Sequence, residues 1–378
     1  MGLISAGTMV LDGQVGRPGW LETSGERILA CASGPPPRPA DDDFPDYTVV
    51  PGFIDMHVHG GGGASYTDTD GISAAAEFHL RHGTTTTLAS LVTSSPAELI
   101  EGVRALAAAS QRGTIAGVHL EGPWLSPERC GAHDPAQMRD PDPDEIDAVL
   151  AAGGGAIRMV TLAPELPGAE AAIRRFRDAG VVVAVGHTDA TYEQTRQAIA
   201  AGATVGTHLF NAMPPLHHRE PGPALALLRD PGVTVELIAD GVHVHPEVVR
   251  AVIQAVGPDR VAVITDALAA AGCADGAFRL GAVPIDVASG VARVRGTSTI
   301  AGSTATMDRL FRALACLGAD PDAALVGAVQ MTAATPARAV GLERVGALRV
   351  GYDANLVVLD GDLRPTAIMA HGEWLANG

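Results

Sequence analysis

The sequence predicts an α/β protein: a (β/α)8 barrel of the TIM type with a small β-sandwich domain built from both chain termini. The barrel is predicted because, from residue 51 onward, eight short apolar runs typical of buried parallel strands alternate with stretches of helical character. The small domain is predicted because strand-like runs without such helices occupy both ends of the chain. We therefore expect residues 1–50 together with 345–378 to form the small β domain, and residues 51–344 to form the barrel.

The amino-acid composition argues against several classes of binding partner. The 378 residues are 47% apolar and 18% charged, as in an ordinary globular protein. The formal net charge of −17 argues against binding to nucleic acid or to anionic membrane surfaces. No apolar run approaches the roughly 20 residues of a membrane span, and the N-terminus lacks the features of an export signal. Because the four cysteines are scattered without CxxC spacing, we expect a protein of the reducing cytoplasm.

The N-terminal segment reads as short strands and turns. Its predicted strands cover residues 8–11, 20–23, 27–30 and 47–50. Between the last two lies GPPPRPADDDFPD (34–46), whose prolines and aspartates disfavour regular structure and predict an exposed loop.

The barrel elements follow in order. The eight predicted strands cover residues 53–59, 84–90, 115–121, 157–163, 181–187, 203–208, 233–239 and 261–266. Helical stretches between them include 71–81, 96–111, 169–179, 191–201 and 246–255. Two more helical stretches, about 304–317 and 322–335, follow the eighth strand. The runs at 355–359 and 366–369 again have the pattern of strands. A doubly wound dinucleotide-binding sheet is excluded, because the glycine runs at 60–63 and 153–155 lack the G-x-G-x-x-G spacing.

Metal-ligand residue types stand where the barrel strands end. His57 and His59 are two apart on the first strand, so their side chains point the same way. The other strand-end residues are Glu121, His187, His208 and Asp266. Because catalytic groups of such barrels lie at the carboxyl ends of the strands, we expect these six to meet. A set of nitrogen and carboxylate ligands without cysteine predicts an open divalent metal site, with zinc favoured and iron, manganese or cobalt as alternatives.

A metal in such a site lowers the pKa of a bound water to about 7. Asp266, on the eighth strand, is our candidate for the carboxylate that takes the water's proton and passes it to a leaving group. The alternative for Asp266 is a helix N-cap before Ala267. The absence of lysine matters here: all 26 basic residues are arginine, so neither a lysine nucleophile nor a carboxylated-lysine metal bridge can form.

Further polar groups surround the predicted centre. They are His133, the turn Asn211-Ala212-Met213, the run His217-His218-Arg219, and His243 with His245. The HHRE run is the most basic point of an acidic chain and would hold an anion such as phosphate, or else form a solvated face. Of His243 and His245, the one nearer the strand end is expected to face the pocket.

These motifs resemble one known family. PGFIDMHVHG, GVHLEGPWL, VGHTDA, THLFNAMPPLHHREPG, ADGVHVHP and VITDA, in this order between residues 51 and about 307, are similar to those of the N-acetylglucosamine-6-phosphate deacetylases of the amidohydrolase superfamily. The resemblance implies hydrolysis of the acetamide of N-acetylglucosamine 6-phosphate to glucosamine 6-phosphate and acetate. It implies attack by metal-bound hydroxide, with Asp266 as general acid/base.

The resemblance also assigns roles. It implies that Glu121, His187 and His208 form the principal metal site, and that His57 and His59 allow a second metal with Glu121 as the bridge. One or two divalent cations per chain are therefore expected. It implies substrate binding by His133, Asn211, the backbone of Ala212, Arg219 and His243. The phosphate-site Arg219 would reach in from a neighbouring subunit, which implies a homodimer.

Two other functions stay open at this stage. Another amidohydrolase, such as a deaminase or a D-amino-acid N-deacylase, would turn over an unphosphorylated substrate without needing Arg219. A non-catalytic scaffold would be expected to have lost a strand-end ligand or Asp266, and none is missing. Cys130 lies in ERCGAHD, three residues before His133. Our hypothesis is that it gates or ligates the metal or acts as a redox-sensitive thiol, and the alternative is that it is an incidental loop residue.

Overall fold

The computed structural model describes residues 1–376, so residues 377 and 378 of the predicted small domain lie outside the described chain. The chain divides into two compact units. One consists of Met1–Asp55, His79–Thr86 and Met307–Gly378, and the other of Met56–Phe78 and Thr87–Thr306. Residues 307–344 thus fall in the same unit as the terminal strands. The ranges 1–50 with 345–378, and 51–344, stay our proposal for the domains.

The predicted barrel is confirmed. Eight strands form one sheet in the order β15-β14-β13-β12-β11-β10-β9-β6. Their bounds are β6 Phe53–Val58, β9 Thr84–Val92, β10 Gly117–Glu121, β11 Ile157–Leu162, β12 Val182–Val185, β13 Ala203–Gly206, β14 Thr234–Leu237 and β15 Val261–Val263. Pairings from β9 to β15 are parallel, and every residue of β6 and β10 is buried, as the continuous apolar runs predict.

Backbone hydrogen bonds close the ring of strands. The Asp266 amide donates to the His57 carbonyl over 2.9 Å, and the His59 amide donates to the Ala267 carbonyl over 2.9 Å. The segment after the last strand is thereby joined to the end of the first. Both bonds lie at the end of the barrel that carries the predicted metal ligands.

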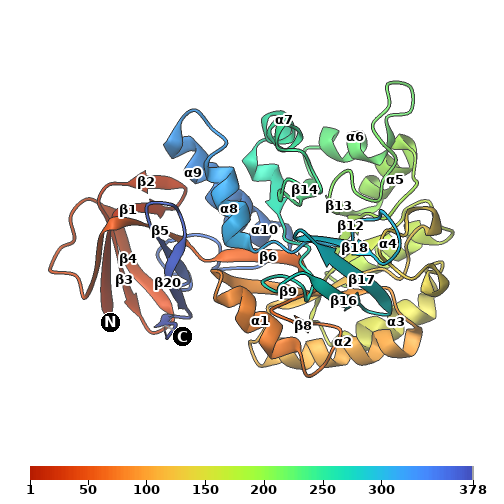
Figure 1. Ribbon diagram of the computed structural model, residues 1–378, viewed down its shortest axis with the longest axis horizontal. Helices are drawn as coiled ribbons and strands as arrows, with labels where there is room; N and C mark the ends of the chain where they lie inside the picture. The colour runs from red at the N-terminus through yellow and green to blue at the C-terminus, as the bar shows by residue number, and fades with distance from the viewer. Residues whose placement is uncertain (377–378) are drawn as a thin grey trace. The chain divides into compact units, whose positions relative to one another are not determined.

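Seven helices accompany these strands. They are α1 Ile72–Leu80, α2 Pro96–Gln111, α3 Pro143–Gly153, α4 Ala169–Asp178, α5 Tyr192–Ala201, α6 Gly222–Arg229 and α7 Pro246–Val256. Helices α2 and α3 lie side by side along one flank of the strands, and α5, α6 and α7 follow one another along another (Figure 1). Side chains fix where α2 and α5 begin: Ser95 with Glu98, and Thr191 with Gln194, form reciprocal capping boxes.

The strands of both chain ends form one mixed sheet, ordered β21-β20-β19-β5-β1-β3-β4 with β2 paired to β1. The bounds are β1 Gly2–Leu11, β2 Gln14–Gly16, β3 Gly19–Ser24, β4 Arg27–Ser33, β5 Asp42–Pro51, β19 Leu356–Leu359, β20 Pro365–Ala370 and β21 Glu373–Trp374. Figure 1 shows N-terminal strands in red and C-terminal strands in blue within this sheet. Leu21, Val49 and Val358 lie in its buried core. The expected small β domain of both termini is therefore present.

One loop prediction is wrong in part. Residues 42–46, expected in the exposed loop, belong to β5, which pairs parallel to β1 from Ile4 opposite Asp42. The register shifts between Ala6 and Thr8, where Pro45 lies, so its missing amide hydrogen costs no regular ladder bond. The proline-rich pattern predicts a loop, whereas Pro45 marks an irregularity within a strand.

A second element was not predicted. After β15, an antiparallel sheet of β16 Gly276–Leu280, β17 Val283–Ala288 and β18 Val291–Val294 precedes the C-terminal helices. Those helices are α8 Met307–Ala315, α9 Pro321–Val329 and, after a π-helical turn over Gln330–Ala334, α10 Thr335–Ala339. Within residues 1–376, no helix is both long and apolar enough to cross a membrane.

Candidate active site

The six predicted ligand side chains come together at the carboxyl ends of the barrel strands. His57 and Glu121 lie within the last residues of β6 and β10, while the other four follow their strands by one to three residues. His187, His208 and Asp266 have positive φ angles of 48°, 26° and 48°, a region that side chains other than glycine rarely adopt. Such backbone conformations persist where the surrounding fold imposes them, and they concentrate at functional sites.

Glu121 is the centre of the cluster. Its Oε1 atom lies 3.0 Å from Nε2 of His208, 3.1 Å from Nε2 of His187 and 3.4 Å from Nε2 of His57. Its Oε2 atom lies 3.1 Å from Nε2 of His59 and 3.2 Å from Nε2 of His133. One buried carboxylate thus faces histidines from several strands and one loop, which suits it to bridge two positive centres.

The distances between ring nitrogens test whether these residues fit a metal. Nε2 of His57 lies 3.2 Å from Nε2 of His59, and Nε2 of His187 lies 3.1 Å from Nε2 of His208. Two neutral imidazole lone pairs gain nothing from such proximity. Two nitrogens bound at about 2.1 Å to one tetrahedral metal lie about 3.4 Å apart, so these spacings match those of a coordination shell. The donor set therefore fits a divalent metal.

Two buried groups can hold such ions. Within residues 1–376, the groups of three or more potential ligands whose atoms all lie within 4.8 Å of one another are His57-His59-Glu121-Asp266 and Glu121-His133-His187. His208 adjoins the second group through its contacts with Glu121 and His187. Cys130, on the loop beside the cluster, belongs to neither group.

Hydrogen bonds at the far nitrogens decide which histidines can act as ligands. Nδ1 of His57 lies 3.1 Å from Oε2 of Glu236, which can only accept, so Nδ1 carries the proton and Nε2 presents a lone pair. Nδ1 of His187 lies 2.8 Å from the carbonyl oxygen of Arg129, and the same reasoning applies. Both histidines therefore have the tautomer that a metal needs.

His133 has the opposite tautomer. The Thr93 amide donates to Nδ1 of His133 over 3.2 Å, so this nitrogen is an acceptor and the proton lies on Nε2. Burial lowers the pKa of His133 to about 4, against the attraction of Glu121, so the ring is neutral. Neutral His133 therefore offers an N–H into the cavity and not a lone pair, which removes it from the second group of possible ligands.

The buried carboxylates of the cluster stabilise positive charge placed between them. Burial alone would lower the pKa of His59, but hydrogen bonds to Asp266 and Glu121 outweigh it and raise that pKa to about 9. Burial would raise the pKa of Asp266, but its neighbour His57 and a hydrogen bond from His59 hold that pKa below its usual value. The two carboxylates therefore stay ionised, and the cluster attracts cations.

Two residues that the sequence analysis missed complete the cluster. Glu236, in the middle of β14, is fully buried beside His57. Its only sequence signal is a carboxylate inside the apolar strand VTVEL. His119, on the same face of β10 as Glu121, has Ser90 Oγ and Thr161 Oγ1 at 2.9 Å from its two ring nitrogens. It lies against His57, with ring centroids 4.4 Å apart.

The cluster opens into a cavity of about 420 Å³. Predicted substrate residues His133, Asn211, Ala212 and His243 line it together with His59, Glu121, His187, His208 and Asp266. Nδ1 of His243 donates to Asp240 over 2.8 Å, whereas His245 caps helix α7. His243 thus faces the cavity, as expected. Leu280, the last residue of the unpredicted strand β16, and residues 298–300, which follow β18, also line the cavity.

Arg219 is the predicted residue that the fold does not bring into this cavity. It is exposed, and its guanidinium lies 2.8 Å from Nε2 of the neighbouring His218. Within this chain, Arg219 therefore has no contact with the metal-ligand cluster among the described residues.

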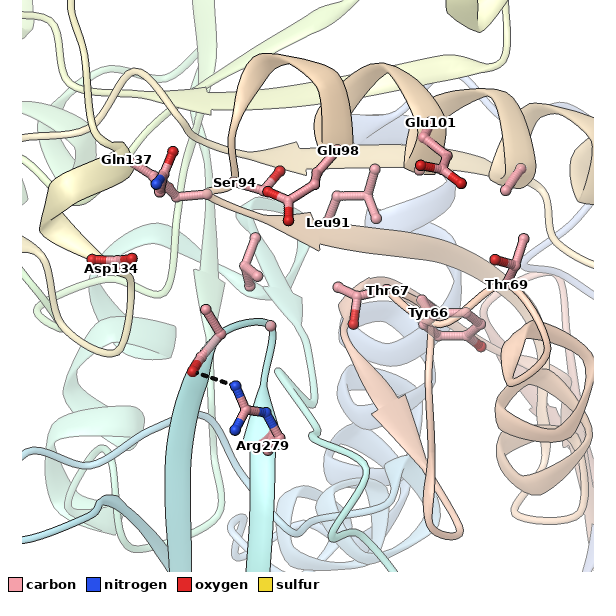
Figure 2. Close-up of a pocket in the computed structure, with 16 residues that line it drawn as sticks. Tyr66, Thr67, Thr69, Leu91, Ser94, Glu98, Glu101, Asp134, Gln137 and Arg279 are labelled. Atoms are coloured by element: carbon pink, nitrogen blue, oxygen red, sulfur yellow. Dashed lines mark hydrogen bonds between the residues drawn. The ribbon is translucent and has the colours of Figure 1, made fainter.

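A second cavity of about 560 Å³ lies beside the first and has a different character. Figure 2 shows its carboxylates Glu98, Glu101 and Asp134 with Arg279, whose guanidinium donates to the carbonyl of Ala282. The loop that carries His133 separates the two cavities, since Asp134 and Gln137 line one and His133 lines the other. Among residues 1–376, no histidine lines this second cavity, whereas five histidines line the first.

Comparison with known proteins gives a consistent result. Residues 48–375 match the model of the amidohydrolase family. The N-acetylglucosamine-6-phosphate deacetylase of Danio rerio is 38% identical over 88% of this chain and 86% of its own length. The N-acetylgalactosamine-6-phosphate deacetylase of Escherichia coli O157:H7 is 36% identical over 94% of this chain and 95% of its own.

Solved structures extend the match to the whole fold. An aspartate-to-alanine mutant of the N-acetyl-D-glucosamine-6-phosphate deacetylase of Mycobacterium smegmatis, in complex with N-acetyl-D-glucosamine-6-phosphate, is 54% identical with a TM-score of 0.98, covering 100% of this chain and 99% of that one. The Thermotoga maritima N-acetylglucosamine-6-phosphate deacetylase is 29% identical with a TM-score of 0.89, covering 98% of each chain.

Proposed function

The chain belongs to the amidohydrolase family and, within it, to the N-acetylglucosamine-6-phosphate deacetylases, and we propose that it hydrolyses the acetamide of N-acetylglucosamine 6-phosphate. The products are glucosamine 6-phosphate and acetate. The observation that carries the proposal is the convergence of His57, His59, His187 and His208 on Glu121 beside Asp266, at the floor of a sugar-sized cavity. A relative 54% identical to this chain has been solved with that sugar phosphate bound.

We assign two divalent cations to the cluster, with zinc as the preferred metal. One would be held by His57, His59, Glu121 and Asp266, and the other by Glu121, His187 and His208. Glu121 would be the ligand shared by both ions, because Oε1 lies close to His187 and His208 and Oε2 lies close to His59. A divalent metal in this position supplies Lewis acidity and lowers the pKa of a coordinated water to about 7.

The chain's own residues do the rest of the chemistry. Hydrolysis of the amide breaks the bond between the acetyl carbon and the nitrogen, and adds hydroxyl to the carbon and a proton to the nitrogen. Neutral His133 donates from Nε2 to the acetyl oxygen as negative charge develops there. Asp266, held ionised, accepts the water's proton and delivers it to the departing amine.

We further propose that the sugar phosphate is held by Asn211, the backbone of Ala212 and Arg219. Asn211 and Ala212 line the cavity of their own chain. Exposed Arg219 serves the active site of a second copy, which makes the enzyme a homodimer. His243, fixed by Asp240, binds the sugar. Four free cysteines suit a cytoplasmic enzyme.

The test combines metal analysis with an acetate-release assay. Purified protein is assayed on N-acetylglucosamine 6-phosphate, on N-acetylgalactosamine 6-phosphate, and on unphosphorylated N-acetylglucosamine. We expect about two metal ions per chain and turnover of the phosphorylated glucosamine derivative far above that of the unphosphorylated sugar. Preference for the galactosamine epimer would redirect the substrate assignment. Equal turnover of the phosphorylated and unphosphorylated sugars would point to another amidohydrolase activity.

A further inference from the structure

Glu236 is the most deeply buried carboxylate beside the metal cluster. It lies on β14 with no exposed surface. Its Oε2 atom accepts from Nδ1 of His57 at 3.1 Å and from the backbone amide of His208 at 3.2 Å. One oxygen thus contacts a residue of each half of the predicted metal site.

The charge on Glu236 needs a positive partner. The other oxygen, Oε1, has no hydrogen-bond partner within residues 1–376, and the ion pairs found for Glu121, Glu236 and Asp266 there all involve histidine. The chain has no lysine. Burying a carboxylate whose charge is only partly compensated is costly. Three buried carboxylates carry more negative charge than one divalent cation compensates, and a second cation bound to the same histidines would balance that charge.

The hydrogen bond between Nδ1 of His57 and Oε2 of Glu236 also determines the tautomer of His57. A carboxylate accepts but does not donate, so it holds the proton of His57 on Nδ1 and turns Nε2 toward His59, Glu121 and Asp266. Carboxylate–histidine pairs of this kind orient metal-binding imidazoles and strengthen them as ligands. No comparable side chain holds the other metal group: His187 is held by the Arg129 carbonyl, and Nδ1 of His208 lacks a partner within residues 1–376.

We propose that Glu236 is a positioning residue that holds His57 as a ligand and thereby determines whether the second metal binds. The inference rests on the proposed metal site but not on the identity of the substrate. It predicts that changes at Glu236 weaken one of the two metal sites selectively.

The experiment compares Glu236→Leu and Glu236→Gln with the wild type. Leucine is similar in size but accepts no hydrogen bond, whereas the oxygen of glutamine can still accept from both partners. Glu101 is exposed on α2, so Glu101→Leu is the matched control for replacing glutamate by leucine. Zinc stoichiometry and affinity are measured by equilibrium dialysis against buffered free zinc, and folding is checked by thermal unfolding.

We expect two zinc ions in the wild type and in Glu101→Leu. In Glu236→Leu, affinity for one zinc should fall by about 10- to 100-fold, leaving one ion per chain at free zinc that saturates the wild type. Glu236→Gln should keep both ions with a smaller loss of affinity. Manganese-loaded wild type should give the electron paramagnetic resonance spectrum of a coupled pair, because two metals that share a ligand lie about 3.5–4 Å apart. Glu236→Leu should give that of isolated ions.

Two results would overturn the proposal: two zinc ions bound to Glu236→Leu with wild-type affinity, or an equal loss of affinity at both sites. If the variants behave as expected but the protein releases no acetate from the sugar phosphates, the substrate assignment fails and the role of Glu236 stands.

Discussion

The backbone amide of Thr93 lies 3.2 Å from Nδ1 of His133, and this contact makes the imidazole a donor at its other nitrogen. Nε2 of His133 is 3.2 Å from Glu121, close enough to be mistaken for a metal ligand on distance alone. The tautomer is the reason why we propose that His133 binds the substrate and not a metal. The distinction has a measurable consequence.

Replacing His133 with alanine should lower kcat by about 10²- to 10³-fold, the usual effect of removing one donor to a developing oxyanion. Metal content should stay at the wild-type value, because no lone pair of His133 binds metal. Acetate release and metal analysis on the same sample check both statements. Loss of one metal ion from His133→Ala would show that His133 is a ligand after all.

Asp266→Asn should lower kcat by about 10²- to 10⁴-fold, the usual range for a lost general acid/base. The amide keeps the shape of the side chain but cannot accept the water's proton. Binding of the intact sugar phosphate, measured by calorimetry, should persist. Wild-type kcat in this variant would assign the proton transfer to another group.

Arg219→Met should raise KM for N-acetylglucosamine 6-phosphate by about 10- to 100-fold, because a hydrogen bond to a charged group contributes about 1.5–3 kcal/mol. KM for the unphosphorylated sugar should not change. Arg250→Met, an exposed arginine on α7, is the matched control and should leave both values unaltered.

Mixing variants tests whether Arg219 acts across a subunit boundary. Differently tagged Arg219→Met and Asp266→Asn chains are co-expressed, and the mixed dimers are purified. If Arg219 reaches the neighbouring site, each mixed dimer regains one intact active site and activity returns. Mixed dimers as inactive as their parents would mean that Arg219 serves its own chain or neither.

Asp240→Asn should destabilise the protein in a pH-dependent way. Burial alone would raise the pKa of Asp240, but hydrogen bonds from His243 and the local backbone hold it below the usual 3.8. A depressed folded-state pKa contributes stability that is present above pH 3.8 and lost as the pH falls through the folded value. We expect a loss of about 1.5–3 kcal/mol at pH 7 that shrinks below pH 3.8.

Denaturant unfolding of the wild type and Asp240→Asn at pH 7 and at acid pH measures this difference. A loss of equal size at both pH values would mean that packing, and not the charged hydrogen bond, accounts for the effect.

The sequence predicted the barrel, and the histidines and carboxylates that meet at its strand ends, because both follow from local patterns. Buried strands give continuous apolar runs, and a histidine or carboxylate that ends such a run stands out, as His187 and Glu121 do. Glu236 could not be given a role in this way, since only the three-dimensional fold brings its side chain into contact with His57, which lies 179 positions away in the sequence. The tautomers of His57 and His133 likewise depend on contacts between distant segments.

The β16–β18 sheet was missed for another reason. Its strands are short and partly exposed, and they lie between the eighth barrel strand and the predicted helix at 304–317, where no element was expected. The error at residues 42–46 has a similar origin, because Pro45 signals a loop unless the register shift around it is known.

The closure of the barrel between its first and last strands has a mechanical consequence. His57 and His59 lie on one side of this seam and Asp266 on the other, with backbone hydrogen bonds between them. A metal held by all three residues would link the first barrel strand to the segment that follows the last one. Removing it with a chelator should then speed hydrogen–deuterium exchange first at the amides of His59 and Asp266, before the rest of the barrel loosens. Metal binding would in that case both stabilise the closure of the barrel and complete the active site.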